Sequence, residues 1–559
     1  MKKRKNISVV VLATILVVTL CSWIFPSASF NSVLVEGERV QVGLFDLFSY
    51  PMVAVTYFSY VIVYALVVSI FYGIANKIPA YHTLVEKIKN AYTGREPIFL
   101  GLVIALTAII VSVTGLSFGM IFIFPFVISI VIAMGYNKLV AASVTVGSVA
   151  AGLAGTTLGT SSVSYLNQLL GLETMDELVS KIVILVAFVI ILIANVLMYA
   201  KKTKNTVVEA EVTTSKKKVD VEVETEALKV TKKDALKPAK KTTTKKDTKT
   251  GKSTKTSAKT KSTKTKSTKT KSTKTKSTKT KSTKTKSTKT KSKSTRASMA
   301  KNSDEILKVS AKDTKKVKCW PFVLIFDFIL IILALAVFDW SGLFDITWFT
   351  DAKNAIDGFE IGNFPIFAKL LGTYSEFGSW SFNIEIPVLI MIGSLILALV
   401  YRVKFSDIVD GIEEGISKAV KPIVTMMLAY IVLIICTYHP FQLMITKFIM
   451  GLTSGLNVVT MTIVAMFASL FNVETVYTAQ STVPYVMSVI GDATLYPLVE
   501  VIFQAVYGLA MLVVPTSVIL IGTLTYLNIP YGQWLKYIWK IFVEVLIVLL
   551  IIFLIILAI

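Results

Sequence analysis

Long apolar stretches alternate with short polar breaks along the chain, in two blocks that run from residue 7 to 200 and from 320 to 559. Crossing a bilayer core of about 30 Å takes ~20 apolar residues in a helix, and windows of that length recur throughout both blocks. The pattern predicts an all-α polytopic membrane protein with roughly twelve transmembrane helices in two related halves, with re-entrant or broken helices among them. The expected spans are 7–25, 52–75, 97–115, 118–136, 139–160, 180–200, 321–339, 385–401, 422–438, 454–471, one or more within 473–527, and 534–559.

The stretch from 473 to 527 is too long for a single span at about 1.5 Å of rise per residue. Pro484, Pro497, Gly508 and Pro515 punctuate it. Proline inside a helix removes a backbone hydrogen bond and kinks or breaks the helix. We therefore expect a re-entrant hairpin or a broken helix in this stretch.

The basic charge of the chain is concentrated in the connector between the blocks. Residues 201–318 hold 39 Lys or Arg against 11 Asp or Glu, whereas the rest of the chain is slightly acidic. Residues 261–290 are six tandem copies of Lys-Ser-Thr-Lys-Thr, which have almost nothing apolar to bury. The sequence therefore predicts a first membrane half (1–200), a disordered linker (201–318) and a second membrane half (319–559).

Two roles remain open for the linker. Lysines near an anionic leaflet gain about 1 kcal/mol each, so the linker would contact anionic lipid along the inner membrane surface. The alternative is a spacer with no specific role. Nucleic acid is not an expected partner, because the excess charge belongs to a solvated connector and not to a globular domain.

Basic residues that flank the spans predict the orientation, because Lys and Arg accumulate on the cytoplasmic side. Lys2, Lys3, Arg4 and Lys5 place the N-terminus inside, and alternation returns the chain to the cytoplasm at Lys201. We expect a multi-pass protein of the cytoplasmic (inner) cell membrane, with its N-terminus and linker in the cytoplasm. The first 25 residues resemble a signal peptide, but the multi-span context favours a retained anchor.

The sequence offers no pattern typical of a catalytic or metal-binding protein. Cys21, Cys319 and Cys436 are scattered, and His82 and His439 have no partner at metal-ligand spacing. The sequence contains neither a Gly-rich phosphate-binding loop followed by Lys-Ser or Lys-Thr nor a His-Glu-x-x-His motif. We therefore expect neither an enzyme nor a resident metal or cofactor.

The two blocks share an order of events that indicates internal duplication. Each begins with a span, an external loop and a second span, followed by a short amphipathic cytosolic segment. These segments are 78–92 and 405–420, and the second has an apolar stripe of Phe405, Ile408, Val409, Ile412 and Ile416. Such a segment either links a moving part of the protein to a fixed one or packs on the bundle. Duplicated halves are characteristic of secondary carriers, whose substrate site lies between the repeats near mid-membrane.

The C-terminal region carries the most specific motif. The run Val514-Pro-Thr-Ser-Val-Ile-Leu-Ile-Gly-Thr-Leu-Thr-Tyr-Leu-Asn-Ile-Pro-Tyr-Gly-Gln-Trp-Leu-Lys536 resembles the closing signature of the YfcC-type carriers. These are relatives of the anaerobic C4-dicarboxylate carriers within the ion transporter superfamily. Weaker similarities follow in the same order through both membrane blocks and skip the connector. They are Gly94-Arg95-Glu96, Phe118-Gly119-Met120, Pro125-Phe126, Gly135-Tyr136 and the segment from Phe405 to Ile416.

This resemblance implies an all-helical carrier with inverted repeats, re-entrant hairpins and unwound helix centres. In such carriers a transport unit moves against a scaffold, and cation gradients drive the movement of organic anions. The chain departs from the family pattern at Ile121, Phe122 and Ile123, which are apolar where relatives carry acidic residues. Thr156 to Ser162 replaces an Asn-Pro-Phe type of break, and Glu474 to Gln480 stands near the place of a Ser-Gly-Ser-Gly hairpin tip.

A carrier site needs polar groups at membrane depth, which are tolerated only where protein or water surrounds them. Gly152 to Asn167 is dense in small polar residues that would unwind a span and expose backbone amides to a substrate carboxylate. The alternative is a Ser/Thr/Gly-lined contact between helices. The predicted substrate-binding residues of this stretch are Thr156, Thr157, Thr160, Ser161 and Ser162.

The matching stretch of the second half falls, by family position, at the second hairpin and the second unwound helix. Its predicted substrate-binding residues are Thr478, Gln480, Ser481, Thr516 and Ser517. An acidic residue in a membrane segment is expensive and indicates function, so Glu474 is the predicted ion-coupling residue. The alternative for Glu474 is a helix cap at the interface. Glu500 and Gln504 lie one turn apart in an apolar helix and would form a second polar contact.

Together these features predict a secondary active transporter, a symporter or antiporter, that moves a small organic anion such as a carboxylate or an amino acid. The coupling ion would be Na⁺ or H⁺, and the partners would be the substrate and the lipid bilayer, with a homodimer left open. The alternative is a non-transporting scaffold or sensor that keeps the carrier fold and binds lipid or an acidic partner through its polybasic linker.

Overall fold

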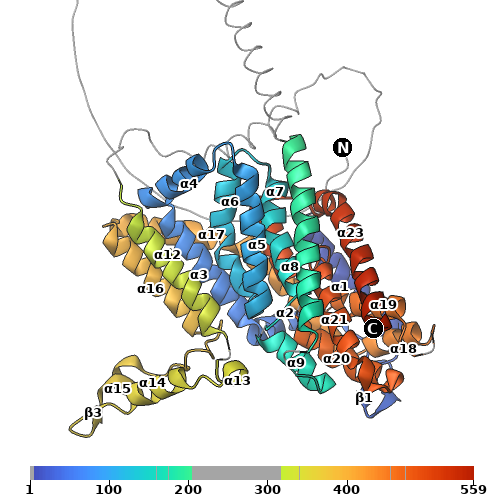
Figure 1. The fold of residues 1–559 in the computed structure, drawn as a ribbon. Helices are drawn as coiled ribbons and strands as arrows, with labels where there is room; N and C mark the ends of the chain where they lie inside the picture. The colour runs from blue at the N-terminus through green and yellow to red at the C-terminus, as the bar shows by residue number, and fades with distance from the viewer. Residues whose placement is uncertain are drawn as a thin grey trace, which may run out of the picture. The chain divides into compact units, whose positions relative to one another are not determined.

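The computed structural model describes residues 6–158, 160–173, 176–203, 317–338, 340–453, 455–471 and 474–559 (Figure 1). Nearly all of the predicted linker, including the Lys-Ser-Thr-Lys-Thr repeats, lies outside these residues. The two membrane blocks, although far apart in sequence, belong to one compact unit. The fold of this unit is almost entirely helical, as the apolar pattern predicts.

The first block begins with a long helix, continues through a small hairpin and a bent helix pair, and ends with a long helix. In order, its elements are α1 (Ile7–Ile24), β1 (Ala28–Asn31), β2 (Val33–Glu36), α2 (Leu44–Tyr57), α3 (Ser59–Ala75), α4 (Pro79–Ala91), α5 (Glu96–Thr114), the 3₁₀ helix η1 (Phe118–Phe122), α6 (Phe124–Ala133), α7 (Lys138–Ala142), the π-helix η2 (Ser143–Gly147), α8 (Ser148–Ala154), α9 (Thr160–Leu170) and the Leu178–Thr203 helix. The two strands pair antiparallel, with Ala28 opposite Glu36.

The second block contains a segment of short elements between its first two apolar helices and a run of interrupted helices near its end. In order, its elements are α12 (Trp320–Ala336), α13 (Trp340–Phe344), α14 (Trp348–Asp357), β3 (Glu360–Ile361), β4 (Phe364–Pro365), α15 (Ile366–Leu371), α16 (Glu385–Val400), α17 (Phe405–Tyr438), α18 (Gln442–Met450), α19 (Val458–Phe471), α20 (Thr475–Ile490), the 3₁₀ helix η3 (Ala493–Leu495), α21 (Tyr496–Ala510), α22 (Val518–Leu527) and α23 (Tyr531–Ala558).

The described residues include six helices that are long and apolar enough to cross a membrane, or seven with the α2–α3 pair, which bends by 65°. Shorter apolar helices occupy most of the other predicted spans, because several of those spans are interrupted. The stretch from 473 to 527 contains α20, α21 and α22, as its prolines and length suggested. The predicted span 118–136 is a 3₁₀ turn followed by the ten-residue helix α6.

The amphipathic segment 405–420 and the span 422–438 are not separate elements. They form one continuous helix, α17, which has Pro422 in its interior. Its predicted apolar stripe lies only partly against the bundle: Ile408 and Ile412 are partly buried and pack against the core, whereas Phe405 is 80% exposed and Val409 45%. The buried face consists instead of Gly411, Gly415 and Ala419. The exposed side of this part of the helix carries charged residues such as Asp410, Glu413 and Lys418, and small residues mark the closely packed face.

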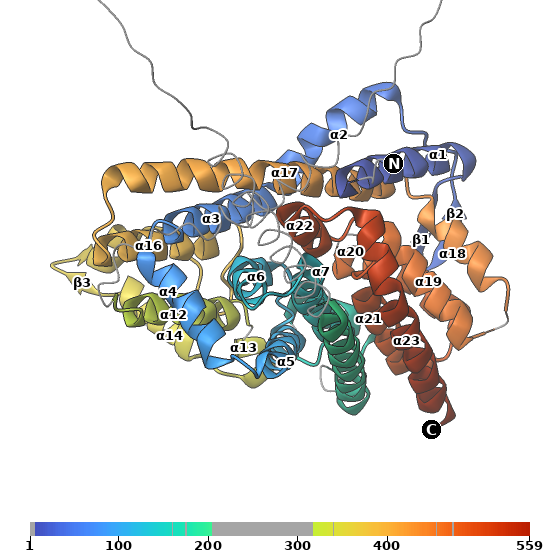
Figure 2. The ribbon, with the colours of Figure 1, turned by 90° about the horizontal axis from the view of Figure 1, so that it is seen from above.

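The glycine face of α17 allows an unusually close approach to α3. A Cβ atom built on Gly73 of α3 would lie 1.9 Å from the carbonyl oxygen of Gly411. A Cβ on Gly415 would lie 2.5 Å from the carbonyl oxygen of Ser69. Only glycine fits at such a backbone-to-backbone contact. Figure 2 shows α17 running beside α3 and continuing along α2 and α1, all of which it contacts.

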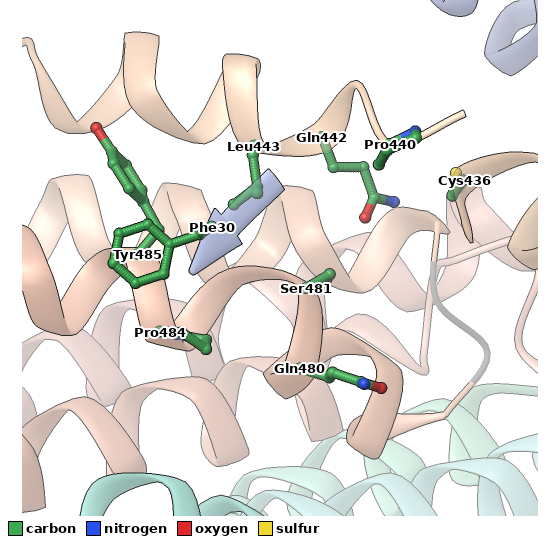
Figure 3. A pocket seen from close by; sticks show the side chains of 9 residues that line it. All are labelled: Phe30, Cys436, Pro440, Gln442, Leu443, Gln480, Ser481, Pro484 and Tyr485. Carbon is green, nitrogen blue, oxygen red and sulfur yellow. The ribbon is translucent and has the colours of Figure 1, made fainter. Parts of the chain in front are cut away.

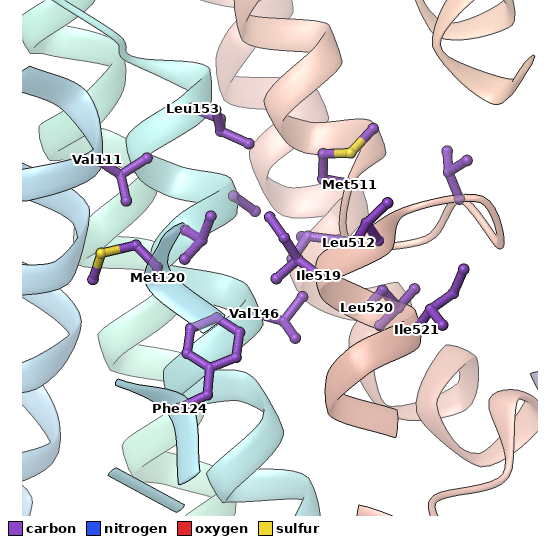
Figure 4. Close-up of a cluster of buried hydrophobic side chains, with 14 of the residues drawn as sticks. Val111, Met120, Phe124, Val146, Leu153, Met511, Leu512, Ile519, Leu520 and Ile521 are labelled. Atoms are coloured by element: carbon purple, nitrogen blue, oxygen red, sulfur yellow. The ribbon is translucent and has the colours of Figure 1, made fainter. Parts of the chain in front are cut away.

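The interrupted helices of the two blocks pack against each other. Helix α8 lies against α5 and α21, α21 also contacts α19 and α23, and α9 contacts α20. Figure 4 shows apolar side chains from both blocks meeting in this region, among them Val146 and Leu153 from the first and Leu512 and Leu520 from the second. The core between the blocks therefore surrounds the positions where the helices break.

Candidate functional site

The first helix break follows Ala154, where α8 ends, and precedes Thr160, where α9 begins. Its backbone groups are held by the neighbouring helix α5. The Ser112 hydroxyl donates to the Gly155 carbonyl over 2.6 Å, and the Thr157 amide donates to the Ser112 carbonyl over 2.9 Å. Unwound backbone at membrane depth requires such partners, since lipid offers none. The break is thus a fixed part of the fold.

The second break separates α21, which ends at Ala510, from α22, which begins at Val518. Helix α23 satisfies two of its carbonyls: the Trp534 indole donates to Leu512 over 2.7 Å, and the Tyr531 hydroxyl donates to Val513. Both aromatic residues belong to the C-terminal motif, from Val514 to Lys536. The Tyr-Gly-Gln-Trp part of this motif therefore has a structural role, which is to hold the unwound backbone.

The two breaks meet where α8 and α21 cross. A Cβ on Gly508 would lie 2.2 Å from the backbone nitrogen of Ala154, so the helices touch at this glycine. One turn earlier on α21, the Gln504 amide donates to the Thr156 carbonyl over 2.6 Å. This hydrogen bond joins the unwound segment of the first half to a helix of the second half.

The third break lies between α19 and α20, and its residues 472 and 473 are outside the described part of the chain. Glu474 stands at the N-cap position of α20, but its side chain makes no capping hydrogen bond. Its carboxylate instead accepts from the hydroxyl of Tyr60 on α3 and, over 2.9 Å, from that of Tyr430 on α17. Glu474 therefore connects the start of α20 to the closely packed α3–α17 pair.

The second and third breaks are also in contact. Thr516 and Ser517 are fully buried at the start of α22. The Thr516 hydroxyl donates to the carbonyl of Leu470, one residue before the end of α19. The Ser517 hydroxyl accepts from the amide of Leu520 and caps α22. Each break is followed by a helix N-terminus, where unpaired amides and the helix dipole favour an anion.

The other predicted residues have different surroundings. Thr156 and Thr157 are buried in the first break, and Thr478 is buried on α20, where its hydroxyl donates back to the Glu474 carbonyl. Thr160, Ser161 and Ser162 form the first turn of α9, and their side chains lie outside what the structure describes.

Gln480 and Ser481 are not at the breaks. They line a small pocket between α20, α18 and the β1 strand (Figure 3). Phe30, Gln442 and Tyr485 line the same pocket.

Two features of this region were not predicted. The first is the pair of tyrosines that bind Glu474. The second is Lys181, which forms an ion pair with Glu500 over 3.1 Å, with both side chains 1% exposed. A lone lysine near the start of an apolar helix was the available signal for the second. No cluster of three or more His, Cys, Asp or Glu that would hold a metal ion occurs among the residues that the structure describes.

The family comparison agrees with this architecture. The model of the C4-dicarboxylate anaerobic carrier family, DcuC, matches residues 36–241 and 266–559. Neither the curated proteins nor the solved structures give a match. The family match covers most of the chain, takes in both membrane blocks except residues 7–35, and confirms the resemblance carried by the C-terminal motif. The chain therefore belongs to the C4-dicarboxylate anaerobic carrier family.

Proposed function

We propose that this protein is a secondary active transporter that moves a small organic anion, in the first place a C4-dicarboxylate, across the cytoplasmic membrane with a cation gradient as its driving force. The family match supports a carrier of such substrates. The observation that carries the proposal is the meeting of the broken helices of the two halves, joined by the Gln504–Thr156 hydrogen bond. Carriers built from duplicated halves bind their substrates between discontinuous helices of this kind.

The chemistry of the site suits an anion. Helices α9, α20 and α22 all begin at breaks, and helix N-termini carry about half a positive charge each. The hydroxyls of Thr156, Thr157 and Thr516 lie in the same breaks and donate to backbone carbonyls, so the donors that an anion would use are the amides of the helix N-termini. A dicarboxylate would replace its water shell with these fixed donors.

Glu474 is our candidate for ion coupling. Its carboxylate accepts hydrogen bonds from Tyr60 and Tyr430, so it ties the third break to the α3–α17 pair. A cation or proton that neutralises this carboxylate weakens charge-assisted hydrogen bonds, which are roughly twice as strong as neutral ones. Binding of the ion would thereby change how firmly α20 is held against α3 and α17.

The test is uptake of radiolabelled succinate into proteoliposomes under an imposed Na⁺ or proton gradient. We expect saturable uptake by the natural protein and loss of gradient-driven accumulation in Glu474→Gln. The matched control is Glu36→Gln, which removes a carboxylate from an exposed ion pair with Lys447. Absence of uptake for succinate and fumarate by the natural protein would contradict the carrier function. Normal accumulation in Glu474→Gln would contradict only the coupling role.

A further inference from the structure

The Lys181–Glu500 ion pair is the most deeply buried charged contact of the described residues. Nζ of Lys181 and Oε1 of Glu500 are 3.1 Å apart, and each side chain is 1% exposed. Apart from this contact, neither atom has a hydrogen-bonding partner in the described part of the chain. Burying two charges is costly, and apolar residues of similar size often serve the fold equally well. Ionisable groups at membrane depth indicate function.

The pair adjoins the first helix break from both sides. On one side, a Cβ on Gly155 would lie 2.7 Å from the backbone oxygen of Lys181, so the break rests directly on the lysine's own turn. On the other side, Glu500 precedes Gln504 by one helical turn, and Gln504 binds the Thr156 carbonyl. A change in the distance or charge of the Lys181–Glu500 pair would therefore alter the contacts at the site where the two halves meet.

The pair also lies close to one face of the bundle. Lys181 is in the first turn of the Leu178–Thr203 helix, and the basic-residue rule predicts the connection that precedes this helix to be external. The charged groups that act on Glu500 are Lys181, Asp176 and Glu177. Of the helices packed on α21, α8 and α19 carry no ionisable side chain. The remaining ones carry Tyr165 on α9, Tyr477 and Tyr485 on α20, and Tyr531, Lys536, Tyr537, Lys540 and Glu544 on α23.

We propose that the Lys181–Glu500 pair is a proton-coupling element, in which Glu500 takes up a proton and Lys181, released from the pair, binds a carboxylate of the substrate. This inference rests on the proposed carrier function and names the coupling ion as H⁺. The proton comes from external water and neutralises the Glu500 carboxylate. Lys181 then exchanges one carboxylate partner for another.

The charge balance explains why uptake of proton and anion would be linked. With Glu500 protonated, a buried ammonium without a counter-ion is unfavourable, and a substrate carboxylate restores the pair. When the proton leaves on the other side of the membrane, Glu500 recovers Lys181 and displaces the substrate. Because linkage is reciprocal, the proton raises substrate affinity by the same factor by which the substrate raises proton affinity.

The discriminating variant is Glu500→Gln, which mimics the protonated state. In proteoliposomes we expect this variant to exchange internal for external succinate, to lose proton-driven accumulation, and to show a KM that no longer varies with pH. Lys181→Met should raise KM, since a substrate contact is removed. The matched control is Lys447→Met with Glu36→Met, an exposed ion pair whose removal should leave the pH profile of KM unchanged. If the pair had only a structural role, replacing Lys181 or Glu500 would lower the amount of folded protein, but KM would still vary with pH as in the natural protein.

A second measurement depends neither on transport activity nor on the folding of the single variants. Infrared difference spectra of the purified natural protein, recorded between acidic and neutral pH, should contain the band of a titrating buried carboxyl. The double variant Lys181→Met with Glu500→Met, which leaves no unpaired charge, should lack this band. A KM of Glu500→Gln that follows pH as in the natural protein, or spectra without a band specific to Glu500, would overturn the proposal. Failure of the natural protein to take up succinate would contradict the carrier function instead, and the infrared titration would still decide the role of Glu500.

Discussion

Replacing Gly508 by alanine tests whether the crossing of α8 and α21 is as close as the structure shows. The added Cβ would lie 2.2 Å from the Ala154 nitrogen and 2.5 Å from its Cα, whereas ordinary van der Waals contacts are 3.4–4 Å. Both neighbours are backbone atoms, so the helices themselves must separate by about 1 Å. That movement also strains the 2.6 Å hydrogen bond from Gln504 to Thr156.

The expected cost follows from two opposing effects. Overpacking a close contact costs roughly 1–3 kcal/mol, and replacing a helical glycine by alanine returns about 0.5–1 kcal/mol. Gly508→Ala should therefore lower the free energy of unfolding by up to about 2.5 kcal/mol in a detergent-unfolding titration, and Gly508→Val by more. The control is Gly101→Ala on α5, where the nearest atoms to a new Cβ are 3.9 and 4.0 Å away. Equal stability of the two alanine variants would show that α8 and α21 do not meet at Gly508.

Three further predictions concern the contacts around the breaks and the α14 segment. Tyr430→Phe keeps the ring stack on Phe58 but removes a donor to Glu474, and it should cost roughly 1–3 kcal/mol of unfolding free energy, whereas Tyr57→Phe at an exposed position should cost nothing measurable. Ser112→Ala removes the donor to the Gly155 carbonyl and should destabilise by roughly 1–3 kcal/mol, while Ser488→Ala on the exposed face of α20 serves as its control. A hydrogen bond from Lys353 lowers the pKa of Asp357. The ionised Asp357 therefore stabilises the α14 segment at pH values above the ordinary pKa of aspartate. This stabilisation is lost as the pH falls through the lowered pKa of Asp357. Trp348 fluorescence should report that acid transition, and Lys353→Met should move it to higher pH.

Helix positions were predictable wherever apolar length alone decides them. The expected span 180–200 is part of the Leu178–Thr203 helix, and 97–115 corresponds to α5. Each is a continuous apolar run with a polar or glycine boundary, and a membrane span is defined by such local properties. Interruptions were predictable in the same way, since prolines and clustered small polar residues mark the ends of α8 and α21.

The closely packed face of a helix was only partly predictable from apolar periodicity. For α17, hydropathy favoured the stripe Phe405, Ile408, Val409, Ile412 and Ile416, of which Ile408 and Ile412 pack against the core and the others are exposed. Apolar periodicity shows which side of a helix is apolar, but it does not show where the backbones of two helices approach each other most closely. The spacing of Gly411 and Gly415 was the informative pattern, because it indicates where two backbones approach each other.

Partners of the polar residues at membrane depth were not predictable, and these partners determine the chemistry. The sequence predicts ion coupling at Glu474 and only a polar contact with Gln504 at Glu500. Glu474 is bound by two neutral hydroxyls, so its neutralisation leaves no opposite charge behind. Glu500 is bound by Lys181, so its neutralisation leaves a buried ammonium that needs a new anion. Glu474 is therefore suited to receive a cation at a joint between helices, whereas protonation of Glu500 would create the binding site for a substrate carboxylate.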